Sequence, residues 1–176
     1  MGKFSFSDVA RYKYRYDDVS EPLKEFKVGL DRSLTETSTS CSLLGVEKNG
    51  KWGWINTSDV FVIPALYDSG FVGCYNGIIE LQKNGKWGGI YRDNPSELAF
   101  SFRYHYLSSF YRDTYVAFNS NDMCALVKPG DVLLTEYKYK GFSKYNRGNV
   151  TEYVRSGFLG REVHGDIDLN TGRELT

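Results

Sequence analysis

The sequence contains very little cysteine or histidine. The chain of 176 residues has three cysteines, Cys41, Cys74 and Cys124, and two histidines, His105 and His164. The cysteines are odd in number and follow no metal-binding spacing, which argues against a disulfide framework and against a zinc site. We therefore expect free, buried cysteines in a reducing compartment, with no cofactor and no bound metal.

Long hydrophobic runs are also missing. No stretch approaches the roughly 18 apolar residues that a membrane-spanning helix needs. The first residues, Met-Gly-Lys-Phe-Ser-Phe-Ser, lack the apolar centre of a secretory signal. We therefore expect a soluble, cytoplasmic protein without a membrane partner.

Neither sign of charge dominates, because 22 Lys and Arg residues face 22 Asp and Glu residues. A protein devoted to duplex nucleic acid is expected to carry a clear basic excess. The balanced charge therefore makes duplex nucleic acid an improbable partner. The length suits one domain or one short repeat array with a real core.

Patterns typical of enzymes are absent from the sequence. There is no Gly-X-Ser-X-Gly nucleophile elbow and no Gly-X-X-X-X-Gly-Lys-Ser/Thr phosphate loop. Residues 166–172 resemble a calcium loop only with the glycine one place too late, so we interpret them as a hairpin turn. We predict that the protein is not an enzyme.

What the sequence does contain is a repeated nonapeptide. Residues 47–55 read Glu-Lys-Asn-Gly-Lys-Trp-Gly-Trp-Ile, and residues 82–90 read Gln-Lys-Asn-Gly-Lys-Trp-Gly-Gly-Ile. Asn-Gly between alternating side chains indicates a type I′ turn, because both central residues need positive φ. Each nonapeptide therefore predicts a tight antiparallel hairpin. Gly53 and Gly88, inside the predicted strands, indicate that a neighbouring ring or strand approaches closely there.

The first nonapeptide is followed by Val-Ile-Pro-Ala-Leu-Tyr-Asp at residues 62–68, and together these segments resemble the bacterial WG-repeat proteins. The unit of that family reads roughly Gly-Lys-Trp-Gly-X-Ile and then Ile-Pro-X-X-Tyr-Asp, and the likeness is specific over residues 43–91. The resemblance implies a β-rich repeat module without shared catalytic residues. The structural signature in this chain comprises Trp52, Gly53, Ile55, Tyr67, Asp68, Trp87, Gly88 and Ile90.

Weaker copies extend the pattern over residues 1–176, which we interpret as a single all-β domain of about four antiparallel hairpin units, each 35–41 residues long. We expect an unpaired second half-repeat at 8–42, repeats at 43–80 and 81–118, a degenerate repeat at 119–158 and a terminal first half-repeat at 159–176. In the last of these, His164 takes the tryptophan position. Pairing of the two half-repeats would close the array into a ring or barrel-like fold and protect the sheet edges. An open, solenoid-like stack with capped ends is the alternative.

The N-terminal half-repeat carries three local predictions. Alternating rings and charges at residues 11–18 favour a strand. Residues 20–26 favour a short helical turn that begins at Ser20. The Ser/Thr-rich residues 31–42 favour a loop.

Two segments of the second repeat are the candidate partner-binding segments. One is the polar excursion at residues 91–97, and the other is the aromatic, charged run at residues 103–113. They mix Tyr with Arg and Asp, the residue types that supply binding energy and specificity. The candidate residues are Arg92, Asp93, Arg103, His105, Tyr106, Arg112 and Asp113.

These residues predict a non-catalytic protein–protein interaction module whose partner is another protein. A neutraliser of a toxin or other effector protein, of the immunity or anti-defence type, is the form that we expect by analogy. The alternative is a protein that binds single-stranded nucleic acid, carbohydrate or another small ligand by stacking on Tyr and Trp rings. Residues 11–16 and 137–140, which interleave bases with rings, favour that alternative.

Overall fold

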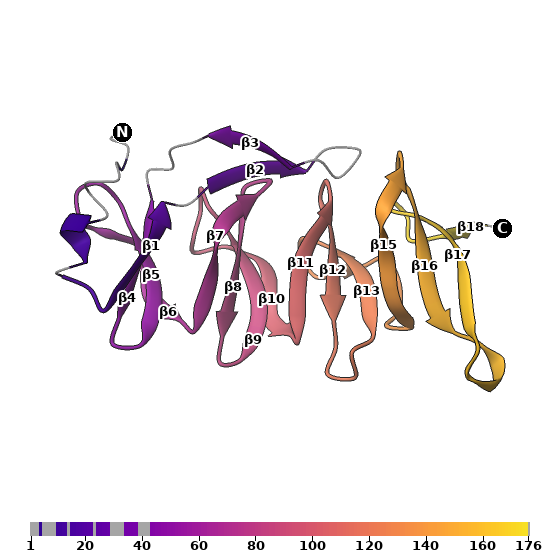
Figure 1. The fold of residues 1–176 in the computed structure, drawn as a ribbon. Coiled ribbons are helices and arrows are strands. Elements are labelled where there is room, and N and C mark those ends of the chain that lie inside the picture. Colours follow the sequence, from indigo (N-terminus) through magenta and orange to yellow (C-terminus); the bar gives the residue numbers. More distant parts are fainter. Residues whose placement is uncertain are drawn as a thin grey trace.

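The computed structural model describes Phe4 and residues 10–13, 15–22, 24–28, 34–38 and 43–175. It confirms an all-β protein, whose strands follow one another along a single axis, except that β2 (Lys24–Val28) and β3 (Leu34–Ser38) lie beside the later strand β7 (Ser69–Tyr75) (Figure 1). Nearly all strand pairs are antiparallel, and the exception among the described residues is a parallel pair between β2 and β7.

The same antiparallel order of four strands is found four times along the chain. In each four-strand group the first strand pairs with the second, the second with the third and the third with the fourth. The groups are β1 (Asp18–Pro22), β4 (Leu44–Lys48), β5 (Lys51–Ile55) and β6 (Phe61–Tyr67); β7, β8 (Ile78–Lys83), β9 (Lys86–Tyr91) and β10 (Leu98–Tyr104); β11 (Tyr106–Tyr111), β12 (Thr114–Phe118), β13 (Cys124–Lys128) and β14 (Val132–Leu133); and β15 (Tyr139–Arg147), β16 (Val150–Ser156), β17 (Glu162–Asp168) and β18 (Glu174–Leu175).

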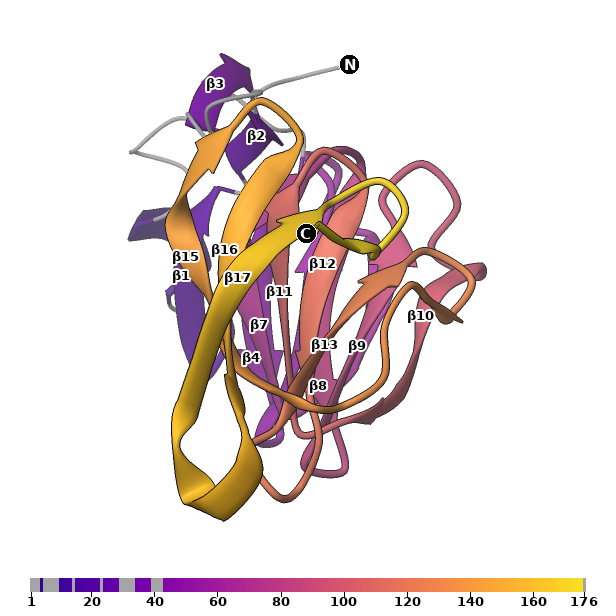
Figure 2. The ribbon, with the colours of Figure 1, turned by 90° about the vertical axis from the view of Figure 1, so that its right-hand side faces the viewer.

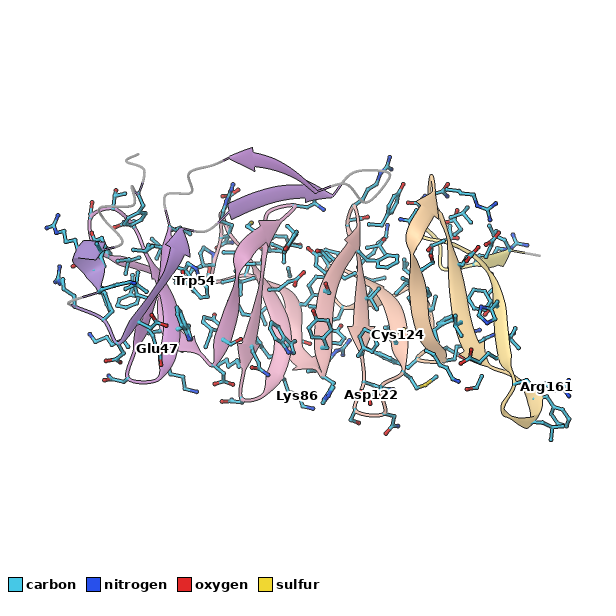
Figure 3. The ribbon with its side chains drawn as sticks, in the orientation of Figure 1. Glu47, Trp54, Lys86, Asp122, Cys124 and Arg161 are labelled. Carbon is cyan, nitrogen blue, oxygen red and sulfur yellow. The ribbon has the colours of Figure 1, made fainter. Side chains whose placement is uncertain are left out.

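The two nonapeptides form the tight hairpins that the sequence predicts. Asn49 and Gly50 have φ values of 54° and 72°, and Asn84 and Gly85 have values of 52° and 72°. Both turns therefore have the positive φ angles of type I′ geometry. The corresponding turns of all four groups lie along one edge of the molecule, which Glu47, Lys86, Asp122 and Arg161 mark in Figure 3.

The repeated glycines stand where the fourth strand of a group crosses the third. A Cβ atom on Gly53 would lie 2.7 Å from the backbone nitrogen of Ala65 in β6. A Cβ atom on Gly88 would lie 2.9 Å from the ring of Phe102 in β10. The predicted close approach of a strand or a ring is therefore confirmed at both positions.

A tyrosine stands two residues before the first strand of each group, at positions 16, 67, 104 and 137. The Tyr16 hydroxyl donates a hydrogen bond to Asp59 Oδ1 at 2.7 Å, and the Tyr104 hydroxyl donates one to Asp131 Oδ1 at 2.6 Å. Both aspartates lie in the turn between the third and fourth strands of the following group, each with a φ of 60°. Each of these hydrogen bonds therefore links a four-strand group to the tyrosine that stands just before it in the sequence.

In the first and second groups, the aspartate that directly follows this tyrosine caps the turn between the second and third strands. Asp17 Oδ2 accepts a hydrogen bond from the backbone N–H of Asn49 at 2.6 Å, and Asp68 Oδ2 accepts one from Gly85 at 2.8 Å. The hydrogen bond from Lys51, followed by that from Gly85, lowers the pKa of Asp68 below its ordinary value. In the third group His105 takes this place, and the turn over residues 119–123 is instead held by the side chain of Asn119.

The core is a series of apolar clusters, one after another along the axis. The first is built on the first group, and each of the others lies across the junction between two neighbouring groups. Ile79, Leu107 and Leu126 are fully buried in the successive junctions. Because each group contacts only its neighbours, the core is continuous but narrow.

The predicted closed ring is wrong, because no sheet formed by the described residues closes on itself. The strands of the first group lie at one end of the molecule and β17 at the other (Figure 1). Ion pairs join β15 to β17 at this end of the molecule, between Lys140 and Glu162 at 3.0 Å and between Arg147 and Asp166 at 3.2 Å. Charged side chains on the last strands therefore cap the stack at this end, and the stack stays open.

Two local predictions for the N-terminal half-repeat are also wrong. Residues 10–12 form a helical turn and not a strand, since the carbonyl oxygen of Tyr12 accepts the N–H groups of Arg15 and Tyr16. Tyr12 and Tyr16 are four residues apart, and their rings pack at 6.3 Å, so the apolar spacing here is helical. Residues 20–22 belong to β1 and residues 24–26 to β2, so the helical turn predicted there is not found among the described residues.

The loop predicted for residues 31–42 is wrong at Leu34–Ser38, which form β3 and pair with β2. Cys41 and most of the other residues of that segment lie outside the described residues. Cys74 and Cys124 are buried and free, as the sequence predicts.

Candidate protein interaction site

The predicted partner-binding residues fall into two sets at opposite ends of the strands. Arg103, His105 and Tyr106 lie where β10 ends and β11 begins. Arg92, Asp93, Arg112 and Asp113 lie at the far ends of β9 and β11. A strand of six residues such as β11 spans about 20 Å, so the two sets do not form one site.

The charges at the far ends are mostly paired within the chain. Arg92 Nε donates a hydrogen bond to Asp93 Oδ1 at 2.8 Å, and the Lys128 ammonium lies 3.2 Å from Asp113. The backbone carbonyl of Arg112 accepts a hydrogen bond from Asn76. This set therefore holds neighbouring turns together and offers few unsatisfied charges to a partner.

At the other end, His105 and Tyr106 continue the chain beyond Tyr104. The backbone N–H of His105 bonds to the carbonyl oxygen of Phe118, and its side chain is exposed. The ring of Tyr106 stands between Trp87 and Phe118, with centroid distances of 5.6 and 6.0 Å, and 37% of the residue is exposed. Trp87, predicted as structural, thus supports one of the predicted binding residues.

Arg103 lines a cleft at the junction of the second and third groups, with a volume of about 300 Å³. The residues around this Arg103 cleft come from two strands and two connecting segments. Arg103 and Tyr104 belong to β10 and Leu133 to β14, while Asn119 follows β12 and Tyr137 precedes β15. The volume is at the small end of ligand pockets, which suits one side chain better than a cofactor.

The guanidinium of Arg103 is held in place without being buried. It lies over the ring of Tyr104, 5.2 Å from the centroid, and donates a hydrogen bond of 3.3 Å to the Tyr104 hydroxyl. The nearest carboxylate oxygen, on Asp131, is 3.9 Å away, and 53% of the Arg103 side chain is exposed. Arg103 is therefore oriented, and it lines the cleft with about half of its side chain exposed.

The pKa shifts in this cluster have a common origin in burial and hydrogen bonding. Burial acts to raise the pKa of Asp131, but the hydrogen bonds from Tyr104 and Ser101 and the charge of Arg103 leave it below its ordinary value. Burial, and then the bond to Asp131, raises the pKa of the Tyr104 hydroxyl. The cluster therefore keeps one fixed positive and one fixed negative charge at neutral pH.

The polar wall of the Arg103 cleft consists mainly of donors. The carbonyl oxygen of the Asn119 side chain accepts bonds from Asn121 and Met123, which leaves its NH₂ group to donate. Tyr137 adds a hydroxyl, and Leu133 provides an apolar wall. A carboxylate with a short apolar stem fits this arrangement, because a guanidinium pairs with a carboxylate through two hydrogen bonds.

One exposed apolar side chain borders the cleft. Leu133 lines it and is 46% exposed, and its neighbour Val132 on β14 is 52% exposed. Figure 2 shows β10, which carries Arg103, on the side opposite β1 and β15. An exposed apolar residue beside an oriented arginine is a composition found in protein-binding patches.

Asn119, Asp131 and Leu133 were not predicted as binding residues, and Tyr137 was predicted only within the alternative stacking segment 137–140. Two signals in the sequence point to them. Val-Leu-Leu at 132–134 is an apolar run directly behind a Pro-Gly-Asp turn, and Tyr137 occupies the place of Tyr67 and Tyr104. Only the stacking of the groups shows that these residues meet Arg103.

The two segments that interleave bases and rings each bury one ring in the core. Tyr12 and Tyr139 are 5% and 1% exposed. The Lys138 ammonium pairs with Glu174 at 2.9 Å.

Among the described residues, no group of three His, Cys, Asp or Glu side chains is placed to hold a metal ion. In the same part of the chain, no helix is long and apolar enough to cross a membrane. Comparison of the sequence with family models and with curated proteins finds no match. Membership of the WG-repeat family therefore stays a prediction that rests on the residues quoted above.

Replacing Tyr104 by Phe is expected to lower the free energy of unfolding by about 2 kcal/mol, since a hydrogen bond to a charged group is lost between two groups of strands. Tyr67→Phe is the matched control. Tyr67 occupies the same place one group earlier, and its hydroxyl makes no hydrogen bond to another described residue. Urea unfolding of both variants measures the difference, and equal destabilisation would show that the bond to Asp131 contributes nothing.

Proposed function

We propose that this chain is a non-catalytic protein–protein interaction module that binds its partner at the Arg103 cleft. The observation that carries the proposal is the oriented and half-exposed guanidinium of Arg103 in a cleft that it shares with Leu133 and two tyrosines. The partner contributes an Asp or Glu side chain, or a C-terminal carboxylate, flanked by apolar residues. A toxin or other effector protein neutralised by this chain is the biological form that we propose by analogy.

Arginine and tyrosine are the residue types that dominate the energy of protein interfaces, above all when apolar neighbours exclude water around them. Tyr104 and Asp131 fix the guanidinium in advance, so less conformational entropy is lost on binding. The balanced net charge agrees with a protein partner, which needs local and not global complementarity.

The test is quantitative capture of partners from the native host with tagged variants. We expect Arg103→Ala to weaken binding of one stoichiometric protein by roughly 30-fold or more, because a central arginine is removed. Leu133→Asp is expected to act in the same direction, because it places a second carboxylate where the partner's carboxylate binds.

Arg112→Ala is the control, since Arg112 is exposed at the opposite end of β11. Retention of the partner by this variant and its loss in the other two supports the proposal. Loss in all three variants, or retention in all three, contradicts it. Recovery of nucleic acid instead of a protein would favour the stacking alternative.

A further inference from the structure

The turn between β16 and β17 carries the two most exposed large apolar side chains of the described residues. Phe158 and Leu159 are 87% and 81% exposed, and no other large apolar side chain in the described part of the chain exceeds 56%. Both belong to one 3₁₀ turn, Phe158–Gly160, at the apex of the hairpin. At such exposure neither side chain packs in the core, so the stability of the fold does not require them.

The backbone of Leu159 gives a second, independent sign that this turn is not an ordinary connection. Its φ of 58° and ψ of 29° are left-handed, which is unfavourable for a residue with a long apolar side chain. Seven other non-glycine residues of the described chain have positive φ, and all of them are Asn, Asp or Arg. The corresponding turns of the first two groups use Asn-Gly, at residues 49–50 and 84–85. The last turn therefore holds two apolar residues at a cost in stability, where polar residues would fold better.

The turn is also held in one conformation by its own hydrogen bonds. The N–H of Gly157 donates to the carbonyl oxygen of Arg161 at 2.7 Å, and the N–H of Gly160 donates to that of Gly157 at 3.3 Å. Directly behind the turn, Ser156 pairs with Glu162 in the ladder of β16 and β17. An ordered, convex apolar apex loses little conformational entropy when it enters a concave surface.

This apex and the Arg103 cleft lie on the same edge of the molecule. Asn119, which lines the cleft, begins the turn of the third group, and Figure 3 marks that turn with Asp122 and the last turn with Arg161. Five strand-to-strand steps separate β11, which follows the cleft residues of β10, from β17 in their sheet, and this is roughly 24 Å at the usual spacing. A standard interface buries about 800 Å² on each partner and is about 30 Å across. One interface therefore has room for both features.

We propose that Phe158 and Leu159 insert into an apolar pocket of the same protein partner that places its carboxylate in the Arg103 cleft, an inference that rests on the proposed function. The cleft, with a volume of about 300 Å³, is too small to hold a partner alone, since stable interfaces need a buried apolar anchor as well as polar contacts. Phe158 supplies such an anchor, and Leu159 beside it enlarges the apolar contact.

Charge at the apex favours a protein pocket over a lipid surface. Arg161 and Glu162, next to the apex, have opposite charges, and Glu162 pairs with Lys140 at 3.0 Å. The neighbouring turns on this edge also carry both signs, as Lys86 and Asp122 show (Figure 3). An anionic bilayer attracts clusters of lysine and arginine, whereas mixed charges suit the local complementarity of a protein surface.

The double variant Phe158→Ser/Leu159→Asn tests the proposal in the full chain, with the protein that the parent captures and Arg103→Ala does not as the purified binding partner. We expect the double variant to bind this protein roughly 10- to 100-fold more weakly, because the apolar anchor is removed. We expect its melting temperature to equal or exceed that of the parent, because asparagine tolerates the left-handed conformation of residue 159. Val60→Thr is the matched control, since it removes an exposed apolar side chain in the turn between β5 and β6 and should leave binding unchanged.

A purely structural role for the turn predicts the reverse pattern, with a lower melting temperature and unchanged affinity. Unchanged affinity of the double variant, with Arg103→Ala still impaired, would overturn this inference and leave the proposed function intact. If Arg103→Ala also binds normally, or if the parent captures no protein, both fail. Co-sedimentation of the parent with mixed phosphatidylcholine–phosphatidylserine vesicles that the double variant loses would assign the turn to a lipid surface and would likewise overturn the proposal.

Discussion

Gly53→Ala lowers the free energy of unfolding by about 3 kcal/mol, because the added methyl group would press on the backbone of a neighbouring strand. The new Cβ atom would lie 2.7 Å from the nitrogen of Ala65 and 2.8 Å from the carbonyl oxygen of Ile63. Both atoms belong to the backbone of β6, so a side-chain rotation cannot relieve the contact. The third and fourth strands of the first group must move apart.

Gly141→Ala is the matched control, because Gly141 is also a strand glycine and no atom outside its immediate chain neighbours lies within 4 Å of its added Cβ. For a chain of this size, 3 kcal/mol corresponds to a fall in melting temperature of about 6 to 12 °C. Calorimetry of both variants gives the comparison. Equal melting temperatures would mean that β6 does not cross β5 at Gly53.

Glu80→Gln removes most of the change in stability that the protein shows between pH 5 and pH 8. Glu80 is 2% exposed, and its Oε1 accepts a hydrogen bond of 2.7 Å from the backbone N–H of Ser109, across the junction of the second and third groups. Burial raises the pKa of this carboxyl from 4.5 to about 7, although the bonds from Ser109 act in the opposite direction.

The direction of this pH dependence follows from the protonation of the Glu80 carboxyl in the folded and in the unfolded chain. Below about pH 4.5 the carboxyl is protonated in both the folded and the unfolded chain, so it costs nothing. As the pH rises towards 7, the unfolded chain releases this proton first, and the free energy of unfolding falls. Above about pH 7 the cost is constant, on the order of 3 kcal/mol.

Glutamine keeps the acceptor for Ser109 and cannot ionise, so the variant is expected to have a nearly flat profile over this range. Glu136→Gln, at an exposed position, is the control and should follow the parent chain. Urea unfolding at intervals from pH 5 to pH 8 provides the measurement. Parallel profiles for the parent and Glu80→Gln would show that Glu80 is not buried at the junction.

The sequence predicts the local structure best where the backbone requires a particular residue. Asn49-Gly50 and Asn84-Gly85 mark their turns because few other residues adopt positive φ. Gly53 and Gly88 indicate close packing because they repeat within strands, where glycine is otherwise unfavourable. These predictions depend on neighbours in the sequence, so a single sequence is enough to make them.

The arrangement of the groups depends on contacts that the sequence does not express as a pattern. The ring prediction failed because the charged residues of β17 alternate as they would in any exposed strand, and nothing in them distinguishes a capped end from a closing edge. The alternation at residues 11–16 fits a strand, but Tyr12 and Tyr16 also fit one side of a helical turn, and the core selected the turn.

The sequence predicts only part of the candidate site, because the rest depends on contacts between four-strand groups. Arg103 lies in an aromatic, charged run that is visible in the sequence, and it does line a cleft. Leu133 and Tyr137, 30 and more residues away, join it only because the third group stacks on the second. Arg112 lies in the same run but at the other end of β11, since a strand carries consecutive residues away from one another.

The most direct test of the proposed function is site-specific photo-cross-linking in the native host. A photoreactive phenylalanine analogue placed at Leu133, on the rim of the Arg103 cleft, is expected to form a covalent adduct with one partner protein. The same analogue placed at Arg112 is expected to form none. An adduct from position 112 and not from position 133, or no protein adduct from either, would contradict the assignment of the Arg103 cleft as the interaction site.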